Sequence, residues 1–497
     1  MIERKATRRE WIGLTVIAFP CALYAMDLTV LNLAVPQLSE QLRPGAAQLL
    51  WIIDIYGFMV SGWLITMGTL GDRIGRRKLL LIGAVAFGIT SLIAAFSTTA
   101  SMLIVARALL GVAGATVAPS TLSLIRHMFE DEHQRTQAIA IWITSYSVGG
   151  TIGPLVGGFM LEHFNWGSIF LLNVPFMLPV LLLGPRLLPE YKDPNAGRLD
   201  VVSAAMSLGA ILMIVYGLKR LAENGVESLP FAIVATGFVL AILFVRRQQH
   251  LTDPLIDVHL FRSARFSGTL SIYLLGTFVS FGLFIFINQY LQLVLGLSPL
   301  VAGLWTLPWN AAFTAGTLLI PRIARRVQAA YVITGGLAIG AVGFLLMTRV
   351  DVEHGLLTVV IGQVLFAFGT SPVVTLCTDI IINSVPPERA GAAAAISETF
   401  GELGGVLGIA MMGSVGLVVY RLAMASAPPA ARATLGGALA VAQTLPAAAA
   451  ATLTHDARSA FVRAMTWTAW IETAIVVLMA VLALTMLRKR KTTTAGE

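Results

Sequence analysis

The sequence predicts an all-α integral membrane protein with fourteen transmembrane helices, arranged as six, two and six, and with both termini in the cytoplasm. Three observations support this fold class. The 497 residues are 57% hydrophobic and only 12% charged, and the mean hydropathy is +0.81, values that water-soluble domains of this size do not show. Long apolar runs recur along the chain, and basic residues gather in every second connection between them.

The apolar runs have the length that a membrane span requires. A helix of about 17 to 25 apolar residues crosses a bilayer core of about 30 Å. An even number of spans places both termini on one side of the membrane. The predicted spans are 11–36, 47–70, 79–97, 102–126, 138–161, 168–188, 200–221, 229–247, 267–293, 300–321, 331–349, 355–378, 394–420 and 462–487.

The basic residues predict which side is cytoplasmic. Most of the 34 Lys and Arg residues lie in the N-terminal segment, after even-numbered spans and in the C-terminal Arg-Lys-Arg-Lys run. Cytoplasmic segments carry such an excess, so the net charge of +8 indicates orientation in a bacterial inner membrane and no nucleic-acid partner. The first apolar run is too long for a signal peptide and lacks a small-residue cleavage site, so we expect a retained helix.

The chain carries a hint of internal repetition. The segment Arg73–Arg77 after the second span is echoed by Arg322–Arg326 after the tenth, with Pro321 where Asp72 stands in the first copy. The tenth span is then the second helix of a second set, and two such parallel halves pack around a midplane site. The predicted parts are a six-helix bundle at 1–190, two inserted helices and a linker at 191–266, and a second bundle at 267–497.

Two smaller features complete the outline. The outer connection 421–460 is rich in alanine and contains prolines that suit helix starts, so it is either a short helical hairpin or a disordered linker. Cys21 and Cys377 both lie inside apolar runs. Their position offers no disulfide framework, and the chain shows no metal-ligand spacing.

A charge-dense loop separates the second and third apolar runs. The stretch GTLGDRIGRRK contains Gly68, Asp72, Arg73, Gly75 and Arg76, and its glycines allow a tight connection. It resembles the pattern G-x-L-x-D-R-x-G-R-R/K of major facilitator transporters. We expect these residues to latch the cytoplasmic side shut, with Asp72 facing the segment 386–389 before the thirteenth span.

Two motifs place opposite charges inside the first bundle. DLTVLNLAVP resembles the first-helix signature of fourteen-helix drug:proton antiporters, with Val35 in place of the usual leucine, and LIVARALLGVAG resembles their fourth-helix pattern. Asp27 and Arg107 are costly in an apolar helix and are therefore candidates for proton or substrate binding. A buried guanidinium needs a carboxylate or carbonyl partner, and Asp27 is the first to test. A purely structural role is the alternative for each.

The fifth span contains GGTIGPLVGG, which resembles the antiporter signature G-x-x-x-G-P-x-x-G-G. Its small residues allow close helix approach, and the proline removes a backbone donor and bends the helix. We expect this helix to form a pliable wall between the halves. The motif residues are Gly149, Gly153, Pro154, Gly157 and Gly158.

Acidic residues also occur in other spans. Glu398 and Glu402 lie one turn apart on one face of the thirteenth span, so desolvation and mutual repulsion favour a proton on at least one of them. The alternative is an interfacial pair. Asp54 is either a solvated interfacial acid or a gate for cations. We assign Glu472 to an interfacial belt because Trp467 and Trp470 precede it.

Aromatic rings can hold a cationic ligand against their faces. Two or three of the aromatic residues in the spans are expected to do so, and the others to be core or interface residues. The candidates are Tyr56, Trp142, Tyr146, Tyr290, Trp309 and Phe400.

Taken over nearly the whole chain, the motifs resemble the QacA/SmvA-type exporters of the major facilitator superfamily. A departure is Gly167-Ser168, where relatives commonly carry Arg and an aromatic residue. The resemblance implies export of lipophilic cations, such as quaternary ammonium antiseptics, biguanides, dyes and viologens, in exchange for protons. It implies no cofactor, a proton gradient as the energy source, and function as a monomer. A nutrient symporter and a channel are the alternatives; nucleotide-binding, zinc-peptidase and serine-hydrolase motifs are absent, so we expect no enzyme.

Overall fold

The computed structural model describes residues 5–192, 199–224, 227–251, 254–385 and 390–487, and all regular structure in these ranges is helical. Helices form because no water is available in the bilayer core to bond free backbone groups. The first group comprises α1 (Arg8–Leu42), α2 (Ala46–Ile74), α3 (Arg76–Ala95), α4 (Ala100–Gly114), α5 (Val117–Met128), α6 (Glu132–His163), α7 (Ser168–Leu171) and α8 (Asn173–Leu187).

Two further groups follow in the sequence. The inserted pair is α9 (Val201–Asn224) and α10 (Ser228–His250). The last group comprises η1 (Val258–Arg262), α11 (Ala264–Gly282), α12 (Phe284–Gln289), η2 (Tyr290–Val294), α13 (Pro299–Ala324), α14 (Ala329–Met347), α15 (Leu356–Asn383), α16 (Ala390–Ala423), α17 (Pro429–Ala433), α18 (Leu435–Ala442) and α19 (Ala447–Met486).

The number of membrane spans differs from the prediction. Within the described ranges, twelve helices are long and apolar enough to cross a membrane, or up to thirteen if the two bent parts of α1 form one span. The predicted fourteen are therefore not confirmed. The predicted span that does not meet this criterion is α13. It has 26 residues, but Pro308, Trp309 and Asn310 in its middle lower its mean hydropathy.

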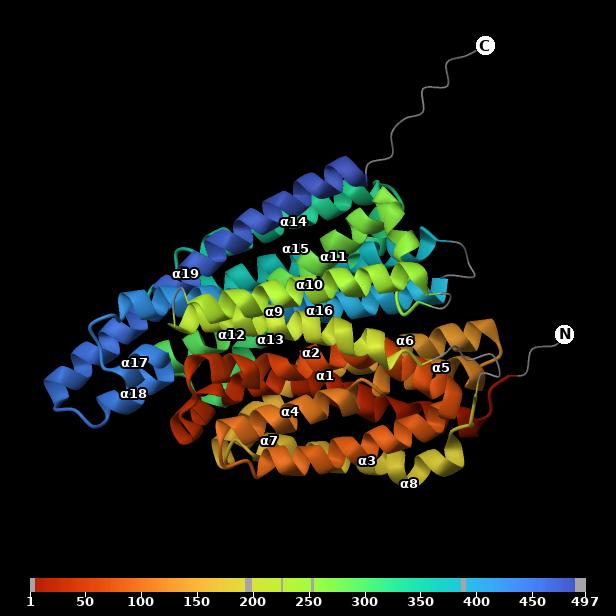
Figure 1. Ribbon diagram of the computed structural model, residues 1–497, viewed down its shortest axis with the longest axis horizontal. Helices are drawn as coiled ribbons and strands as arrows, with labels where there is room; N and C mark the ends of the chain where they lie inside the picture. Colours follow the sequence, from red (N-terminus) through yellow and green to blue (C-terminus); the bar gives the residue numbers. More distant parts are fainter. Residues whose placement is uncertain (1–4, 193–198, 225–226, 252–253, 386–389, 488–497) are drawn as a thin grey trace, which may run out of the picture.

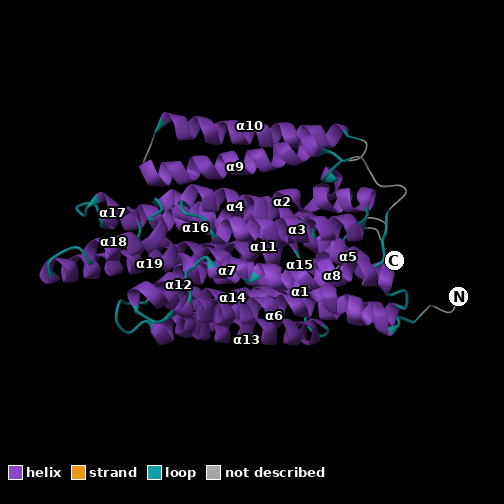
Figure 2. Ribbon diagram, turned by 90° about the horizontal axis from the view of Figure 1, so that it is seen from below, coloured by secondary structure: helices purple, strands orange, loops and turns teal. Residues whose placement is uncertain are grey.

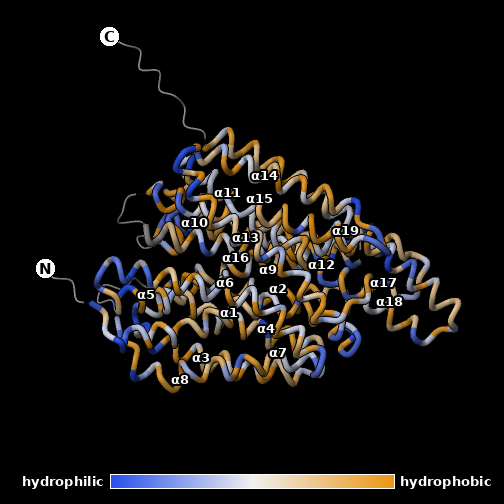
Figure 3. Tube along the Cα trace, turned by 180° about the vertical axis from the view of Figure 1, so that it is seen from behind, coloured by the Kyte–Doolittle hydropathy of each residue, from blue (hydrophilic) through white to orange (hydrophobic). Residues whose placement is uncertain are grey.

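The first and last groups lie side by side, as the red-to-yellow and green-to-blue ribbons of Figure 1 show. Hydrophilic residues gather at the two ends of the helices, and the middle is mainly hydrophobic (Figure 3). α1 begins and α19 ends at one end of the molecule, whereas α17 and α18 lie at the opposite end. Following the predicted orientation, we call the end with α17 and α18 the outer end.

The inserted helices form a separate layer. Figure 2 shows α9 and α10 along one side of the bundle. α10 packs on α9, and α9 packs on both α2 and α16, which belong to different groups. The insertion therefore covers one of the lines along which the two groups meet.

The outer connection is helical. Pro429 begins α17 and Pro446 precedes α19, in agreement with the hairpin alternative and against a disordered linker. α18 packs on α17, on α19 and on α1. α19 has 40 residues, about 60 Å of helix, and so starts well before the predicted span 462–487.

Candidate functional site

The first part of the site is an ion pair inside the first group. The two parts of α1, Arg8–Asp27 and Thr29–Leu42, meet at 43°, so Asp27 ends the first part. The Arg107 Nη1 donates a hydrogen bond to the Asp27 carboxylate, and its Nε donates to the Ile52 carbonyl over 3.3 Å. The guanidinium also lies 4.7 Å from the Tyr56 ring centroid. Both side chains are buried, so each neutralises the other.

The second part joins the two halves. The Tyr24 hydroxyl of α1 donates a hydrogen bond of 2.7 Å to Oε1 of Glu402 on α16. Tyr24 also packs 6.1 Å from the Tyr56 ring and 5.8 Å from the Tyr146 ring. Tyr24 was not among the residues predicted from the sequence, although it precedes Asp27 by three residues and therefore lies on the same helix face.

Aromatic rings surround this bond on the side of the first group. Trp142 and Tyr146, one turn apart on α6, lie edge to face at 5.0 Å, and the Trp142 indole donates to the Thr121 hydroxyl over 3.0 Å. Both were predicted as cation contacts; Tyr146 packs on Tyr24, and Tyr24 packs on Tyr56. Rings in this arrangement present π-faces that attract a cation.

Two cavities lie beside these residues. The first, of about 150 Å³, is lined by Glu398, Glu402, Tyr273, Thr277 and Phe281, among others. Glu398 is exposed although it lies within a membrane helix, so its carboxyl faces open space inside the protein.

The second cavity has a volume of about 190 Å³ and lies between the halves. Phe281 belongs to its wall as well. Ala25 and Thr151 contribute from the first group, and Trp309 and Phe313 from the last. Trp309 stacks on Phe313 at 5.9 Å, which places this predicted aromatic residue in a cavity wall.

Two predicted aromatic residues lie away from these cavities. Tyr290 is fully buried and donates from its hydroxyl to the Asp351 carbonyl over 2.7 Å. Phe400 packs with Phe261 of η1, 6.0 Å between centroids. Neither contributes to the cavity walls described above.

The glycines of α6 face two different helices. A Cβ on Gly149, Gly153 or Gly157 would lie 2.0 to 2.5 Å from atoms of α1, and a Cβ on Gly158 would lie 2.7 Å from Leu300 of α13. Pro154 contacts Gly303, also on α13. α6 is therefore closely packed between the helix that carries Asp27 and the last group, and larger side chains at these positions would separate them.

Asp54 is not a solvated acid. It is 1% exposed, and its carboxylate accepts a hydrogen bond of 2.6 Å from the Lys219 ammonium of α9. The ammonium lies 3.8 Å from the Trp51 ring centroid. Lys219 is also 1% exposed, so Arg107 is not the only buried basic residue. Lys219 lies near the outer end of the predicted span 200–221. A basic residue in an apolar span was the signal that could have identified it as the partner of a buried acid.

Glu472 corrects a second expectation. Trp467 and Trp470 are 55% and 50% exposed, in agreement with an interfacial belt, but Glu472 is 0% exposed. Two residues along a helix differ by about 200° in direction. Glu472 therefore points into the bundle, whereas Trp470 lies on the exposed face of the same helix.

The charged loop is bound to its own half. Asp72 forms an ion pair of 2.5 Å with Arg76, whose Nη1 donates to the Pro119 carbonyl over 3.2 Å. Gly75, between α2 and α3, has a φ of 113°, which strongly favours glycine. Gly68 lies near Pro119, and Arg73 is exposed. The predicted partner segment 386–389 lies outside the described residues.

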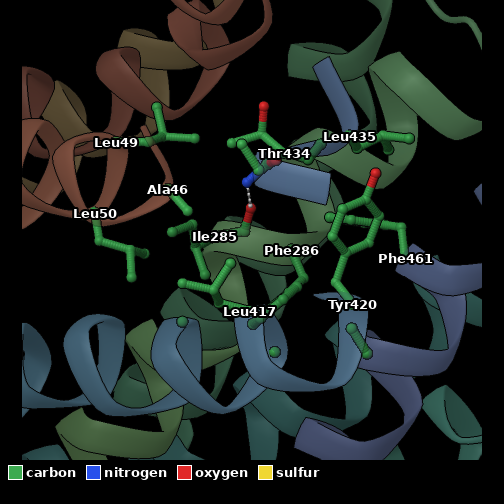
Figure 4. A pocket seen from close by; sticks show the side chains of 15 residues that line it. Ala46, Leu49, Leu50, Ile285, Phe286, Leu417, Tyr420, Thr434, Leu435 and Phe461 are labelled. Atoms are coloured by element: carbon green, nitrogen blue, oxygen red, sulfur yellow. Dashed lines mark hydrogen bonds between the residues drawn. The ribbon is translucent and has the colours of Figure 1, made fainter. Parts of the chain in front are cut away.

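The outer seam between the halves is packed. A cavity of only about 70 Å³ remains there, lined by side chains from α2, α12, α16, α18 and α19 (Figure 4). Leu49 and Leu50 face Phe286 and Leu417 across it. A drug-sized ligand needs roughly 300–1,000 Å³, so the outer side is closed in this conformation.

Comparisons with known proteins agree with this architecture. The Major Facilitator Superfamily model matches residues 17–409. The multidrug efflux pump LfrA of Mycolicibacterium smegmatis is 43% identical over 482 residues, which cover 96% of this chain and 95% of that protein. The methyl viologen resistance protein SmvA of Salmonella typhimurium is 35% identical over 475 residues, 91% of this chain and 93% of SmvA.

A solved structure shares the fold at low identity. A bacterial homolog of the human lysosomal transporter Spinster, in an inward-facing and unoccupied conformation, superposes with a TM-score of 0.68 at 17% identity, covering 97% of this chain and 99% of that one. The chain is a multi-pass protein of the bacterial inner membrane and a drug efflux transporter, not an enzyme. It belongs to the Major Facilitator Superfamily, to the QacA/SmvA type of multidrug efflux pumps.

Proposed function

We propose that this transporter exports lipophilic mono- and divalent cations, such as quaternary ammonium antiseptics, biguanides, dyes and viologens, in exchange for protons. The observation that carries the proposal is the bond between Tyr24 and Glu402, which joins the halves beside a cavity with a second carboxyl, Glu398. No basic partner of either glutamate occurs among the described side chains. A proton or a bound cation is left to neutralise them.

Cations and protons compete for these carboxyls in the proposed cycle. From the cytoplasm, an organic cation reaches Glu398 and Glu402 and rests against the rings of Tyr146 and Trp142. Attraction between charge and ring quadrupole strengthens when water is excluded. After the protein opens outward, protons neutralise the glutamates, and the cation leaves because its counter-charge is gone.

Asp27 has a separate task in this scheme. Arg107 already neutralises it, so an incoming cation meets the glutamates first. A proton that binds Asp27 releases Arg107, whose positive charge then repels the cation from the cavity. Export thus uses a proton on Asp27 to convert a neutral pair into a fixed positive charge.

Everted membrane vesicles with an acidic interior test the proposal. Ethidium and methyl viologen serve as monovalent and divalent probes, and the pH gradient is followed in parallel. We expect wild-type uptake of both probes to dissipate the gradient, and Asp27→Asn and Glu402→Gln to reduce uptake at least about tenfold. Glu353→Gln, an exposed carboxyl in an outer loop, is the matched control.

Two results would overturn the proposal. One is wild-type uptake that persists unchanged after the pH gradient is collapsed, which would indicate a channel. The other is full uptake by both carboxyl variants at normal expression.

We also propose that Asp72 latches the cytoplasmic side in the outward-open state. In the present conformation it binds Arg76 of its own half, so the latch is released. Asp72→Asn is expected to favour the inward-open state and to raise labelling of a cysteine placed in the cytoplasmic half of the cavity. Labelling equal to that of the parent protein would contradict this role.

A further inference from the structure

A third carboxyl of the last group lies outside the site described above. Glu472 is in the middle of α19 and is 0% exposed. Neither of its carboxyl oxygens has a hydrogen-bond partner among the described residues. Burial of a polar group without a hydrogen bond is unfavourable, so an acid in this state calls for a functional explanation.

Small side chains make the space that Glu472 occupies. A Cβ on Gly282, the last residue of α11, would lie 2.5 Å from Oε1 of Glu472 and 2.9 Å from Cγ of Met412. The Gly408 carbonyl of α16 lies 3.4 Å from the same point. Glu472 therefore lies where α11, α16 and α19 meet.

The groups around Glu472 cannot neutralise a negative charge. Gly282, Gly408 and Met412 do not titrate. The titratable residues of the packed helices lie further along them: Tyr273 on α11 about 13 Å from Gly282, and Glu402 on α16 about 9 Å from Gly408, at 1.5 Å per residue. α14 carries only Tyr331, near its start. On α19 itself the nearest charged residue is Arg463, about 13 Å along the helix from Glu472, and Arg458 donates to the Leu293 carbonyl over 3.0 Å.

Tyr420, further out on α16, is also occupied, because its hydroxyl donates to the Ala431 carbonyl. An ionised, unpaired carboxylate in such surroundings would cost several kcal/mol or more. The form of Glu472 that fits this conformation is therefore the neutral acid.

Glu472 lies at the seam between α11, α16 and α19, and these helices must move relative to one another during alternating access. α11 ends at Gly282 and α12 resumes at Phe284, so the helix is interrupted next to the carboxyl. Just below, α11 and α16 are in close contact, since a Cβ on Gly408 would lie 2.1 Å from the Phe278 carbonyl. Phe281, adjacent to the interruption, lines both central cavities, which connects the seam to the transport site.

We propose that Glu472 is a further proton-binding site, occupied when the outer side is closed and emptied when the α11–α16–α19 seam opens outward. Closure of the outer side then takes up one proton from outside. This inference deepens the proposed function, because it adds a proton that gates the conformation without contacting the transported cation.

Outer accessibility without any drug tests this inference. In a background with Cys21 and Cys377 replaced by alanine, Leu50→Cys reports on the outer seam, because Leu50 contacts Gly413 of α16. The rate of maleimide labelling of purified protein in lipid nanodiscs is measured from pH 5.5 to 8.5. At each pH it is divided by the rate for the same cysteine in denatured protein, because the thiolate fraction itself rises with pH; this ratio is the labelling compared below. In the parent we expect labelling to rise at least about fivefold with pH, as the closed population falls.

Two variants separate the carboxyl from its surroundings. Glu472→Gln keeps the shape of the neutral acid, so labelling should stay low and change less than about twofold over the pH range. Gly282→Ala adds a methyl group where Oε1 lies and should raise labelling even at pH 5.5. Thr473→Val, which removes a neighbouring hydroxyl that donates within its own helix, should behave like the parent.

Labelling of Glu472→Gln with the same pH dependence as the parent would overturn the inference, as would a parent without pH dependence. Because no transport is measured here, failure of the labelling test leaves proton-coupled export to be judged by the vesicle experiment, and the reverse also holds.

Discussion

The acids in the membrane helices of the two halves are neutralised in different ways. In the first group, Asp27 is paired with Arg107 and Asp54 with Lys219. In the last group, Glu398, Glu402 and Glu472 have no basic partner in the part of the chain that the structure describes, and only Glu402 has a hydrogen bond, from Tyr24.

The difference separates fixed charges from variable ones. An acid with a basic partner forms a pair without net charge in every state in which the two stay together. An acid without one must bind a proton or a cation whenever it is buried. The acids of the last group therefore need a proton or a cation to balance their charge. In the first group each acid is balanced by its own basic partner, and in the proposed cycle this changes only when a proton binds Asp27.

The largest effect should come from breaking the first fixed pair. Arg107→Gln leaves Asp27 buried without its partner, so we expect transport to be lost and the free energy of unfolding to fall by about 3–5 kcal/mol. Thermal unfolding in detergent and ethidium uptake in vesicles measure the two effects. The double variant Asp27→Leu/Arg107→Leu should recover most of the stability but no transport. Recovered transport would show that the pair is only structural.

The Asp54–Lys219 pair is expected to contribute to stability but not to transport. Lys219→Met alone should destabilise the protein by a similar amount, because Asp54 would be buried and unpaired. In Lys219→Met/Asp54→Leu, stability should return, and uptake should remain within about twofold of wild type. Loss of uptake in a stable double variant would move Asp54 from the fixed group to the variable one.

Loss of the hydrogen bond between Tyr24 and Glu402, which joins the two halves, should have an intermediate effect. Tyr24→Phe removes a hydrogen bond to a carboxyl group, an interaction worth about 1.5–3 kcal/mol when the acceptor is charged. We therefore expect uptake to fall by about tenfold and the free energy of unfolding to fall by no more than about 3 kcal/mol. The pH profile of uptake should shift as well, since Glu402 loses a donor. Tyr331→Phe, at the exposed start of α14, is the control and should leave both properties unchanged.

The smallest effect concerns a pair outside the membrane core. Asp200 accepts hydrogen bonds from Ser203 and Arg247; desolvation opposes ionisation, but these donors outweigh it and lower the pKa of Asp200. A lowered pKa stabilises the fold above the unfolded value and loses this contribution as pH falls through the folded value. Asp200→Asn should therefore reduce the melting temperature slightly at pH 7 and by less at pH 3. Equal losses at both values would contradict this assignment.

Sequence patterns predicted the helices and their motifs well, because apolar length and small-residue spacing are local properties. They also indicated Arg107 as the partner to test for Asp27, because a buried guanidinium needs a carboxylate. Direction around a helix was harder to predict. Glu472 was assigned to the membrane interface from its exposed neighbours Trp467 and Trp470, although it points the other way.

Contacts between distant helices were the other limit. The Lys219–Asp54 pair depends on where the inserted α9 packs, and the bond from Tyr24 to Glu402 depends on how the two halves meet. Neither arrangement follows from local hydropathy. The span count also deviated, since Pro308, Trp309 and Asn310 make α13 too polar in its middle for a criterion based on apolarity.

The position of α9 and α10 makes the two sides of the transporter unequal toward the bilayer. α9 contacts both α2 and α16, so the inserted pair stands between that junction and the surrounding lipid. On the junction of α6 with α13, apolar side chains such as Ile152 and Leu304 are exposed. The α6–α13 flank of the transporter is therefore in direct contact with lipid, while the opposite flank is shielded from lipid by the inserted pair.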